Sequence, residues 1–279
     1  MTFVTRFAPS PTGYLHRGHA YSALTAFEAA RAAGGRFLLR IEDIDATRCR
    51  PEYDAAILED LAWLGLRWEE PVRRQSEHLT DFETAIAGLR DRGLVYRCFK
   101  TRKEIDIGRA PHAPAVAYVG APLDAREEAE RLALAEPFAW RLSLAAAHKA
   151  LDGFDHLTFV EEGVDGSSPR TVQARPETAG DIVLARKDVG VAYHLAVVHD
   201  DALQGVTHVI RGEDLFEATH IQRLLQALLD LPTPVYRHHG LLTGADGKRY
   251  AKRDKAQTLR ELRATGVGAQ DLRAELGFS

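Results

Sequence analysis

The sequence predicts an α/β protein in which a parallel sheet is interrupted by an inserted α+β subdomain and followed by a short helical C-terminal segment. Strand and helix patterns alternate in the first part of the chain, the alternation breaks down in the middle, and regular patterns resume near residue 181. We expect residues 1–96 and 181–240 to form the two halves of one sheet domain. Residues 97–180 should form the insertion, and 241–279 a basic loop and the tail.

The first half contains strands and helices in strict alternation. Phe3 to Phe7 and Arg36 to Ile41 are apolar enough for buried strands. An alanine-rich helix is expected between them from Gly18 to Ala33. Apolar residues then recur at helical spacing from Pro51 to Leu64 and from Asp81 to Arg92, which predicts two further helices.

The insertion and the second half give shorter signals. Strands are expected in the insertion at Phe138 to Leu142 and His156 to Val160. The second half should contain buried strands at Asp181 to Leu184, Tyr193 to His199 and Val206 to Ile210. An amphipathic helix should follow at Ala218 to Leu229. The tail should form two short helices within Thr258 to Gly277.

Composition favours an ordinary globular protein. Of 279 residues, 45% are hydrophobic and 27% charged, and no apolar run approaches the ~20 residues that span a bilayer. The two cysteines, Cys49 and Cys98, lie far apart, which fits a reducing compartment, and we expect a cytoplasmic protein with no membrane partner. The net charge of -4 disfavours nucleic acid, yet basic residues gather at 97–109 and 248–263. These stretches bind RNA phosphates or are simply solvated surfaces.

A nucleoside triphosphate site is predicted where the first strand leads into the first helix. His16 and His19 form an H-x-G-H pattern around Gly18, at a helix start whose free N–H groups attract phosphate. A later basic loop, Asp246 to Arg253, supplies Lys252 for the leaving pyrophosphate. The alternative is that the two histidines only cap or pack the helix.

A pocket for a small dicarboxylic amino acid is predicted beside it. Arg6, Glu42 and Arg211 follow or end predicted strands, and the carboxyl ends of parallel strands form the ligand-binding edge of such sheets. Arginine suits a carboxylate and a buried carboxylate suits an ammonium group. The alternative is that these charges pair with one another, for example Arg211 with Glu42.

Five segments together resemble the catalytic domain of class I glutamyl-tRNA synthetases, in the same order along nearly the whole chain. They are Arg6 to Gly13 with His16 to His19, Arg40 to Asp45, Tyr193 to Val198 with Asp200 and Asp201, Arg211 to Asp214, and the D-G-K-x-x-x-K-R loop at Asp246 to Arg253. The resemblance implies a Rossmann-like parallel sheet of class I aminoacyl-tRNA synthetase type.

The resemblance also implies site residues and partners. L-glutamate would be bound by Arg6, Phe7, Ala8, Pro9, Ser10, Glu42, Tyr193 and Arg211. ATP would be bound by His16, Gly18, His19 and Lys252, with both histidines and the lysine acting in catalysis. Mg²⁺ would accompany ATP.

The acceptor is inferred from length. Glutamyl-tRNA synthetases continue into an anticodon-binding domain, whereas this chain ends about 26 residues after Arg253 (279 minus 253), which is short for a domain. It therefore resembles the short paralogues, the glutamyl-Q tRNA(Asp) synthetases, which activate glutamate without tRNA and transfer it to queuosine in the anticodon loop of tRNA(Asp). We expect a monomer. Alternatives are a truncated glutamyl-tRNA synthetase acting on tRNA(Glu), an H-x-G-H nucleotidylyltransferase, and a non-enzymatic binding paralogue.

Two positions depart from the family pattern. Many members hold zinc in the insertion through C-x-C, a tyrosine and a last cysteine, whereas Cys98 is followed here by Phe99 and Lys100, and Pro122 stands at the last position after Tyr118. Zinc is therefore not expected, since a tetrahedral site needs four ligands. The K-L-S-K core of the basic loop is also altered, to the residues from Arg249 to Lys252.

Overall fold

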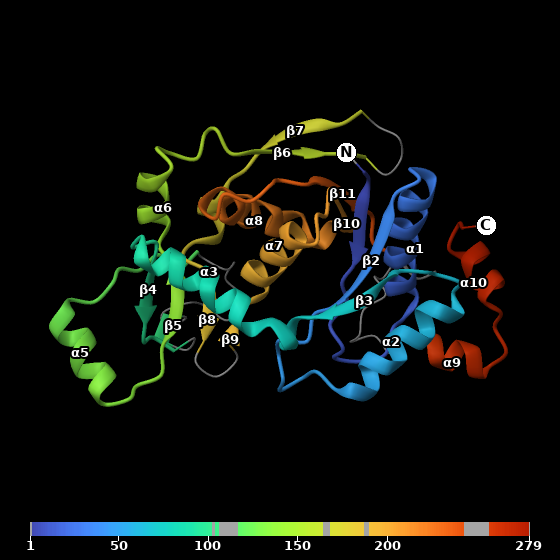
Figure 1. Cartoon of the computed structure of the whole chain (residues 1–279), viewed down its shortest axis with the longest axis horizontal. Coiled ribbons are helices and arrows are strands. Elements are labelled where there is room, and N and C mark those ends of the chain that lie inside the picture. Colours follow the sequence, from blue (N-terminus) through green and yellow to red (C-terminus); the bar gives the residue numbers. More distant parts are fainter. Residues whose placement is uncertain are drawn as a thin grey trace.

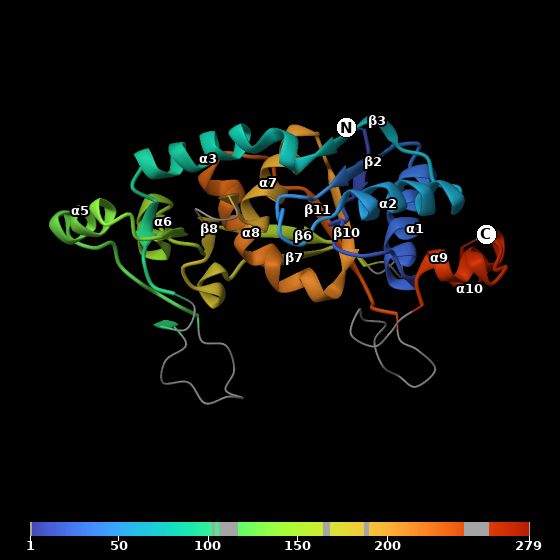
Figure 2. The same ribbon diagram turned by 90° about the horizontal axis from the view of Figure 1, so that it is seen from below.

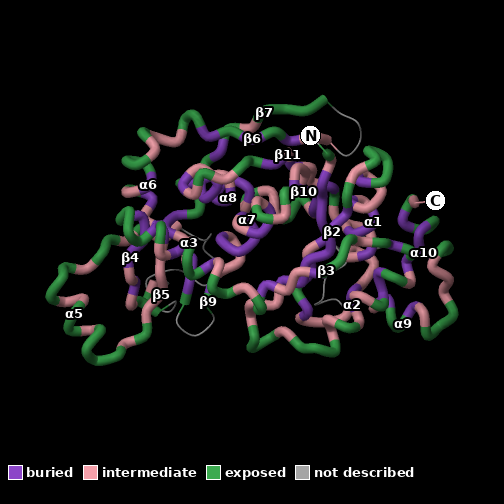
Figure 3. Tube along the Cα trace, viewed as in Figure 1, coloured by how far each residue is buried: buried purple, intermediate pink, exposed green. Residues whose placement is uncertain are grey.

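A computed structural model of the chain describes residues 2–101, 104–105, 117–163, 168–186, 190–242 and 257–278. The molecule is elongated, with helix α5 (Ala125–Ala133) at one end and helices α9 (Leu259–Ala264) and α10 (Ala269–Glu275) at the other (Figures 1 and 2). Buried residues concentrate on the strands and helices between these ends (Figure 3). No described helix is long and apolar enough to cross a membrane.

Parallel strands form the centre of the molecule. Strands β1 (Val4–Phe7), β2 (Arg36–Ile41) and β3 (Glu69–Arg74) lie side by side, and β10 (His208–Gly212) pairs in parallel with β11 (Val235–His239). The two groups meet at the start of β1, where the Thr207 N–H donates to the Val4 carbonyl at 2.9 Å. This arrangement confirms the predicted α/β fold.

Helices cover the strands as the apolar spacing predicted. Helix α1 (Arg17–Ala32) buries its alanines and Leu24, and α2 (Pro51–Trp63) begins at a proline suited to the first helical turn. Helices α3 (Leu79–Asp91) and α8 (Phe216–Leu228) lie within two residues of their predicted bounds. The two predicted tail helices are α9 and α10, whose Leu259, Leu262 and Leu272 are buried in the same core as α1 and α2.

The segment predicted as an insertion contributes to two sheets. Strands β4 (Val95–Cys98) and β5 (Ala139–Leu142) form an antiparallel sheet with β8 (Val183–Arg186) and β9 (Gly190–Val191). The hairpin of β6 (Thr158–Glu161) and β7 (Arg170–Gln173) instead extends the central sheet, because β6 pairs with β11. Helix α6 (Leu144–Ala150) lies between β5 and β6 in the chain. The strand predicted at Asp181 to Leu184 thus belongs to the antiparallel sheet.

One predicted strand was wrong. Residues predicted as a strand from Tyr193 to His199 form the first part of helix α7 (Tyr193–Leu203). The segment is rich in valine, which favours strands in isolation. Leu195 to Val198 are nevertheless buried as a consecutive run in the helix, so the usual alternation of apolar and polar positions is absent. Tertiary burial therefore overrode local preference.

Candidate active site

A cavity of about 580 Å³ lies at the carboxyl ends of β1, β2, β10 and β11. This is the edge at which open parallel sheets bind ligands. The cavity is lined by every predicted site residue in the described part of the chain: Arg6, Phe7, Ala8, Pro9, Ser10, His16, Gly18, His19, Glu42, Tyr193 and Arg211. Lys252 and the rest of its loop, 243–256, lie outside the described residues. Residues from four separate segments are thus brought to one wall.

The two histidines both cap helix α1 and line the cavity. The Gly18 N–H donates to Nδ1 of His16 at 3.1 Å, and the His16 N–H donates to Nδ1 of His19 at 3.2 Å. Since each Nδ1 accepts a hydrogen bond, a neutral ring carries its proton on Nε2. The rings lie tilted against each other with centroids 3.8 Å apart. The capping alternative and the ligand-binding role are therefore compatible.

Gly18 is required by the position of the His16 ring. A Cβ atom at residue 18 would lie 3.1 Å from Cε1 and 3.2 Å from Nδ1 of His16. Contacts of that length are tight, so a side chain would displace the imidazole. The family resemblance placed Gly18 in the ATP site, and the structure adds that this residue lies directly against the ring of His16.

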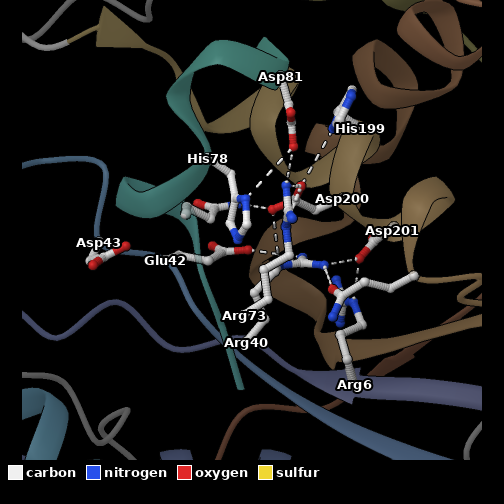
Figure 4. A network of polar contacts seen from close by, with 12 residues as sticks. Arg6, Arg40, Glu42, Asp43, Arg73, His78, Asp81, His199, Asp200 and Asp201 are labelled. Carbon is white, nitrogen blue, oxygen red and sulfur yellow. Dashed lines mark hydrogen bonds and ion pairs between the residues drawn. The ribbon is translucent and has the colours of Figure 1, made fainter. Parts of the chain in front are cut away.

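Arg6 and Glu42 belong to one buried network of ion pairs (Figure 4). Asp201 on α7 accepts from Nε of Arg6 at 3.0 Å and from Nη1 of Arg40 at 2.8 Å. Nη2 of Arg40 donates in turn to Oε1 of Glu42 at 3.1 Å. Burial alone would raise the pKa of Asp201, but the two guanidinium groups hold that pKa below its ordinary value. Arg40 thereby connects the predicted carboxylate-binding and ammonium-binding residues.

The network continues away from the cavity to helix α3. Asp200, which is fully buried, accepts from Nε of Arg73 and from the Gln75 amide, both at 3.0 Å. Nη2 of Arg73 reaches Asp81 at the start of α3 at 2.8 Å. The geometry of the cavity wall is thus coupled by hydrogen bonds to the position of α3.

Arg211 is held without a carboxylate partner among the described residues. Its Nε donates to Nε2 of His238 at 3.1 Å, and its Nη2 donates to Oγ1 of Thr219 at 2.7 Å. His238 is fixed from its other side by Glu161, with 2.8 Å between Nδ1 and Oε2. The remaining nitrogen, Nη1, is buried and has no hydrogen-bond partner in the described part of the chain. A buried donor left unpaired is costly, which suits a site completed by an anionic ligand.

The charges of the predicted pocket are therefore paired in part. Glu42 and Arg211 do not bond to each other, because Glu42 bonds to Arg40 and Arg211 to neutral groups. Burial raises the pKa of Glu42 above its ordinary value, although Arg40 and Arg6 oppose the shift. A substrate ammonium group beside Glu42 would favour its ionised form in the same way.

Several cavity residues were missed by the sequence argument. Tyr21 and Ser22 lie one helical turn beyond Gly18 and His19, so helical periodicity could have identified them. His239 and Gly240 follow the carboxyl end of β11, and Nε2 of His239 lies 3.0 Å from Oγ of Ser22. The sequence signal was the strand–glycine boundary at Gly240, which resembles the end of β10 at Gly212.

Two positions of the zinc pattern, Cys98 and Tyr118, lie together near a buried carboxylate. Sγ of Cys98 is 3.9 Å from the Tyr118 hydroxyl. The buried Asp181 beside them accepts from the Tyr96 hydroxyl at 2.8 Å and from the N–H groups of Gly120 and Leu144 at 2.9 Å. The described ranges contain no group of three metal-ligating side chains. Hydrogen bonds to Asp181 therefore connect the segments of this subdomain.

Comparisons with known proteins agree with the geometry. Residues 2–276 match the family described as tRNA synthetases class I (E and Q), catalytic domain. A glutamyl-Q tRNA(Asp) synthetase of Rhodobacter capsulatus is 48% identical, and the match covers 99% of this chain and 100% of that protein. One of Deinococcus radiodurans is 40% identical, over 100% of this chain and 89% of its own. The chain therefore belongs to the class I glutamyl- and glutaminyl-tRNA synthetase family and, within it, to the glutamyl-Q tRNA(Asp) synthetases.

Longer relatives match over part of their length. A solved glutamate tRNA ligase of Elizabethkingia meningosepticum, in complex with its amino acid, superposes with a TM-score of 0.76 at 27% identity. That match covers 96% of this chain and 54% of the solved chain. A glutamate–tRNA ligase of Dinoroseobacter shibae is 38% identical, and 61% of its length is covered. The chain thus corresponds to about half of the longer enzymes.

Proposed function

We propose that this protein activates L-glutamate with ATP, without tRNA, and transfers the glutamyl group to queuosine in the anticodon loop of tRNA(Asp). The observation that carries the activation step is the buried, unpartnered Nη1 of Arg211, a residue that lines the same cavity as Glu42 and the paired histidines. The acceptor is supported by the name and full-length match of the Rhodobacter capsulatus relative. A reaction that consumes ATP and modifies tRNA belongs in the cytoplasm.

In the first step the cavity binds the two reactants in a fixed orientation. Arg211 and Arg6 bind carboxylate oxygens, and Glu42 accepts from the ammonium group of glutamate. The α-carboxylate oxygen attacks the α-phosphorus of ATP, and pyrophosphate leaves with the electrons of the broken P–O bond. Holding both groups in place converts a bimolecular reaction into an effectively unimolecular one.

The triphosphate is bound by the start of helix α1. The helix contributes the positive end of its dipole, and His16 and His19 can donate from Nε2 because their Nδ1 atoms accept backbone N–H groups. We propose that Lys252 stabilises the leaving pyrophosphate. Mg²⁺ is usually held by substrate phosphates and one or two carboxylates, and the cavity carboxylate of Asp214 could supply one of these ligands. The ion would offset the negative charge of the phosphates.

In the second step a hydroxyl of the queuosine ring attacks the carbonyl carbon of the adenylate. An ester bond forms, AMP leaves, and the hydroxyl proton passes to the leaving phosphate or to solvent. The same Arg211 and Glu42 contacts keep the glutamyl group in place, so the second reaction needs no new binding site for the amino acid.

The activation step is tested by ATP–pyrophosphate exchange. Exchange should require glutamate and proceed without tRNA. Arg211→Lys should lower kcat/KM for glutamate by about 100-fold, because a lysine cannot reproduce three directed N–H contacts. Arg237→Lys is the matched control, since Arg237 lies on the neighbouring strand and pairs with Glu162 outside the cavity. Equal effects of the two substitutions would contradict the role of Arg211.

The acceptor is tested separately with labelled glutamate. Label should appear on tRNA(Asp) that contains queuosine and not on tRNA(Glu). Label on tRNA(Glu) alone would support a glutamyl-tRNA synthetase. Exchange with another acid and none with glutamate would support a nucleotidylyltransferase, and binding without exchange would support a non-enzymatic paralogue.

A further inference from the structure

A second hollow, of about 310 Å³, adjoins the catalytic cavity. The two share Ser10, Thr12, Glu42 and Tyr193 as a common wall. The opposite side of the second hollow is made by β8 and β9, through residues such as Val183 and Val191. It therefore lies between the glutamate pocket and the antiparallel sheet.

A third hollow, of about 360 Å³, adjoins the second. They share Arg186, Gly190 and Val191. One side of the third hollow is apolar and comes from α3, through Phe82 and Ile86. The catalytic cavity, the second hollow and the third hollow thus follow one another from the HxGH histidines to the antiparallel sheet, and each shares wall residues with the next. We call this series the track.

The other side of the third hollow is aromatic. Phe138 and Trp140 of β5 line it, half-buried, with ring centroids 5.5 Å apart. The guanidinium carbon of Arg97 on β4 lies 4.6 Å from the Trp140 ring centroid. Unpaired RNA bases stack on aromatic rings and arginine planes of this kind.

We propose that the second hollow holds the acceptor nucleoside of the RNA and that the third holds an unpaired base next to it in the same loop. The inference rests on the proposed function. An acceptor hydroxyl must reach the acyl carbon of a glutamate bound at Glu42 and Tyr193, so its ring has to lie just across that wall. The second hollow has the volume of a small ligand pocket, at the lower end of the usual range.

The shape of the track favours a single-stranded loop. The nucleotide that reacts must leave its stack to enter a pocket, and a neighbouring base that loses its stacking partner regains one on Trp140. Asp45 and Arg48 line the second hollow and bond to each other at 2.6 Å, so its polar side is already arranged before RNA binds. The RNA loop is therefore bound by base stacking in addition to phosphate contacts.

The first test separates activation from transfer. Trp140→Leu should leave glutamate-dependent ATP–pyrophosphate exchange unchanged and raise the KM for a queuosine-containing tRNA(Asp) anticodon stem-loop roughly 10- to 100-fold, the effect of losing one base stack. Trp63→Leu is the matched control, because Trp63 is also half-buried but lies on α2, away from the track. Normal exchange with an unchanged KM for the stem-loop would overturn the proposal.

A second test begins with the wild-type protein, whose result does not depend on the stability of a variant, and then compares the two variants. The stem-loop carries 2-aminopurine beside the acceptor nucleotide, and its fluorescence is followed during titration with protein. Saturable quenching that Trp140→Leu abolishes and Trp63→Leu retains supports the track. Binding without quenching overturns it. Absence of glutamate-dependent ATP–pyrophosphate exchange in the wild-type protein would instead refute the proposed function. The quenching would still show whether a base stacks in the track.

Discussion

Arg6 on β1 contacts Asp201 on α7 through a buried ion pair, with 3.0 Å between Nε and Oδ1. Only the Nε side of the guanidinium is engaged by this pair, and Arg6 also lines the catalytic cavity. Oδ1 of the same Asp201 accepts from Arg40, which bonds to Glu42. One carboxylate therefore positions both a cationic and an anionic residue of the proposed glutamate pocket.

Asp201→Asn should raise the KM for glutamate about tenfold and leave the KM for ATP within about twofold of the wild type. An amide retains the shape but loses the charge that orients Arg6 and Arg40. Substrate-dependent exchange kinetics measure both constants. Asp81→Asn, at the outer end of the same network, serves as the control. A parallel rise in both KM values would indicate general loss of structure instead of positioning.

Gly18→Ala should weaken ATP use without destabilising the fold. The added Cβ displaces the His16 ring, so kcat/KM for ATP should fall at least about tenfold. Alanine is the better helix former by up to roughly 1 kcal/mol, but displacing His16 weakens its cap on the residue-18 N–H at a similar cost, so the melting temperature should change little. Thermal melting and exchange assays on one preparation check both effects. A marked fall in both kcat/KM for ATP and the melting temperature would contradict this explanation.

His194 should make the protein less stable in mild acid. Burial, reinforced by Arg211, lowers its pKa to about 4, so the folded state keeps it neutral while the unfolded chain protonates near pH 6.5. The unfolded state therefore binds more protons between these values, and stability falls as pH drops. The loss between pH 7.5 and pH 5 should be about 2 kcal/mol from this residue.

Urea unfolding of His194→Phe at the two pH values isolates that contribution. The variant should lose about 2 kcal/mol less than the wild type between pH 7.5 and pH 5. Other buried histidines, such as His238, also have lowered pKa values and remain in both proteins. Identical pH dependence of the two proteins would show that His194 does not titrate as described.

Asp181→Ala should destabilise the antiparallel sheet region. The substitution leaves the Tyr96 hydroxyl, the buried Leu144 N–H and the partly buried Gly120 N–H without their acceptor, at a cost of about 3 kcal/mol. Asp155→Ala, at an exposed position, is the control. Thermal melting measures the loss. A zinc chelator should leave the wild-type melting temperature unchanged, and a marked fall on chelation would show that a metal contributes.

Much of the site could be predicted from the sequence because its residues follow recognisable strand ends. Parallel strands end at one edge of a sheet, so Ser10, Glu42 and Arg211 could be expected to meet there although they are far apart in the chain. His16 and His19 could be placed at a helix start by the strand that precedes them. Helices with clear apolar spacing, such as α2 and α8, were predicted almost at their observed bounds.

The network behind the pocket could not be predicted, because its geometry depends on α7. The strand predicted at Tyr193 to His199 would have ended before Asp200 and Asp201, so it gave these two carboxylates no defined direction. In the helix they lie about two turns from Tyr193, and both face the strands that carry Arg6 and Arg40. Nothing in the local sequence distinguishes a buried helix from a buried strand in this segment.

The amino-acid sequence alone determined the class of fold, the family and the chemical groups at the strand ends, since these depend on local periodicity and on short motifs. Tertiary packing decided which groups are engaged: Arg40 bonds to Glu42, while one nitrogen of Arg211 stays without a partner among the described residues. Packing also placed β5 and β8 beside α3 and so created the adjoining hollows. The physical reason is that ion pairing and cavity shape depend on distances between segments far apart in the chain, which local patterns do not encode.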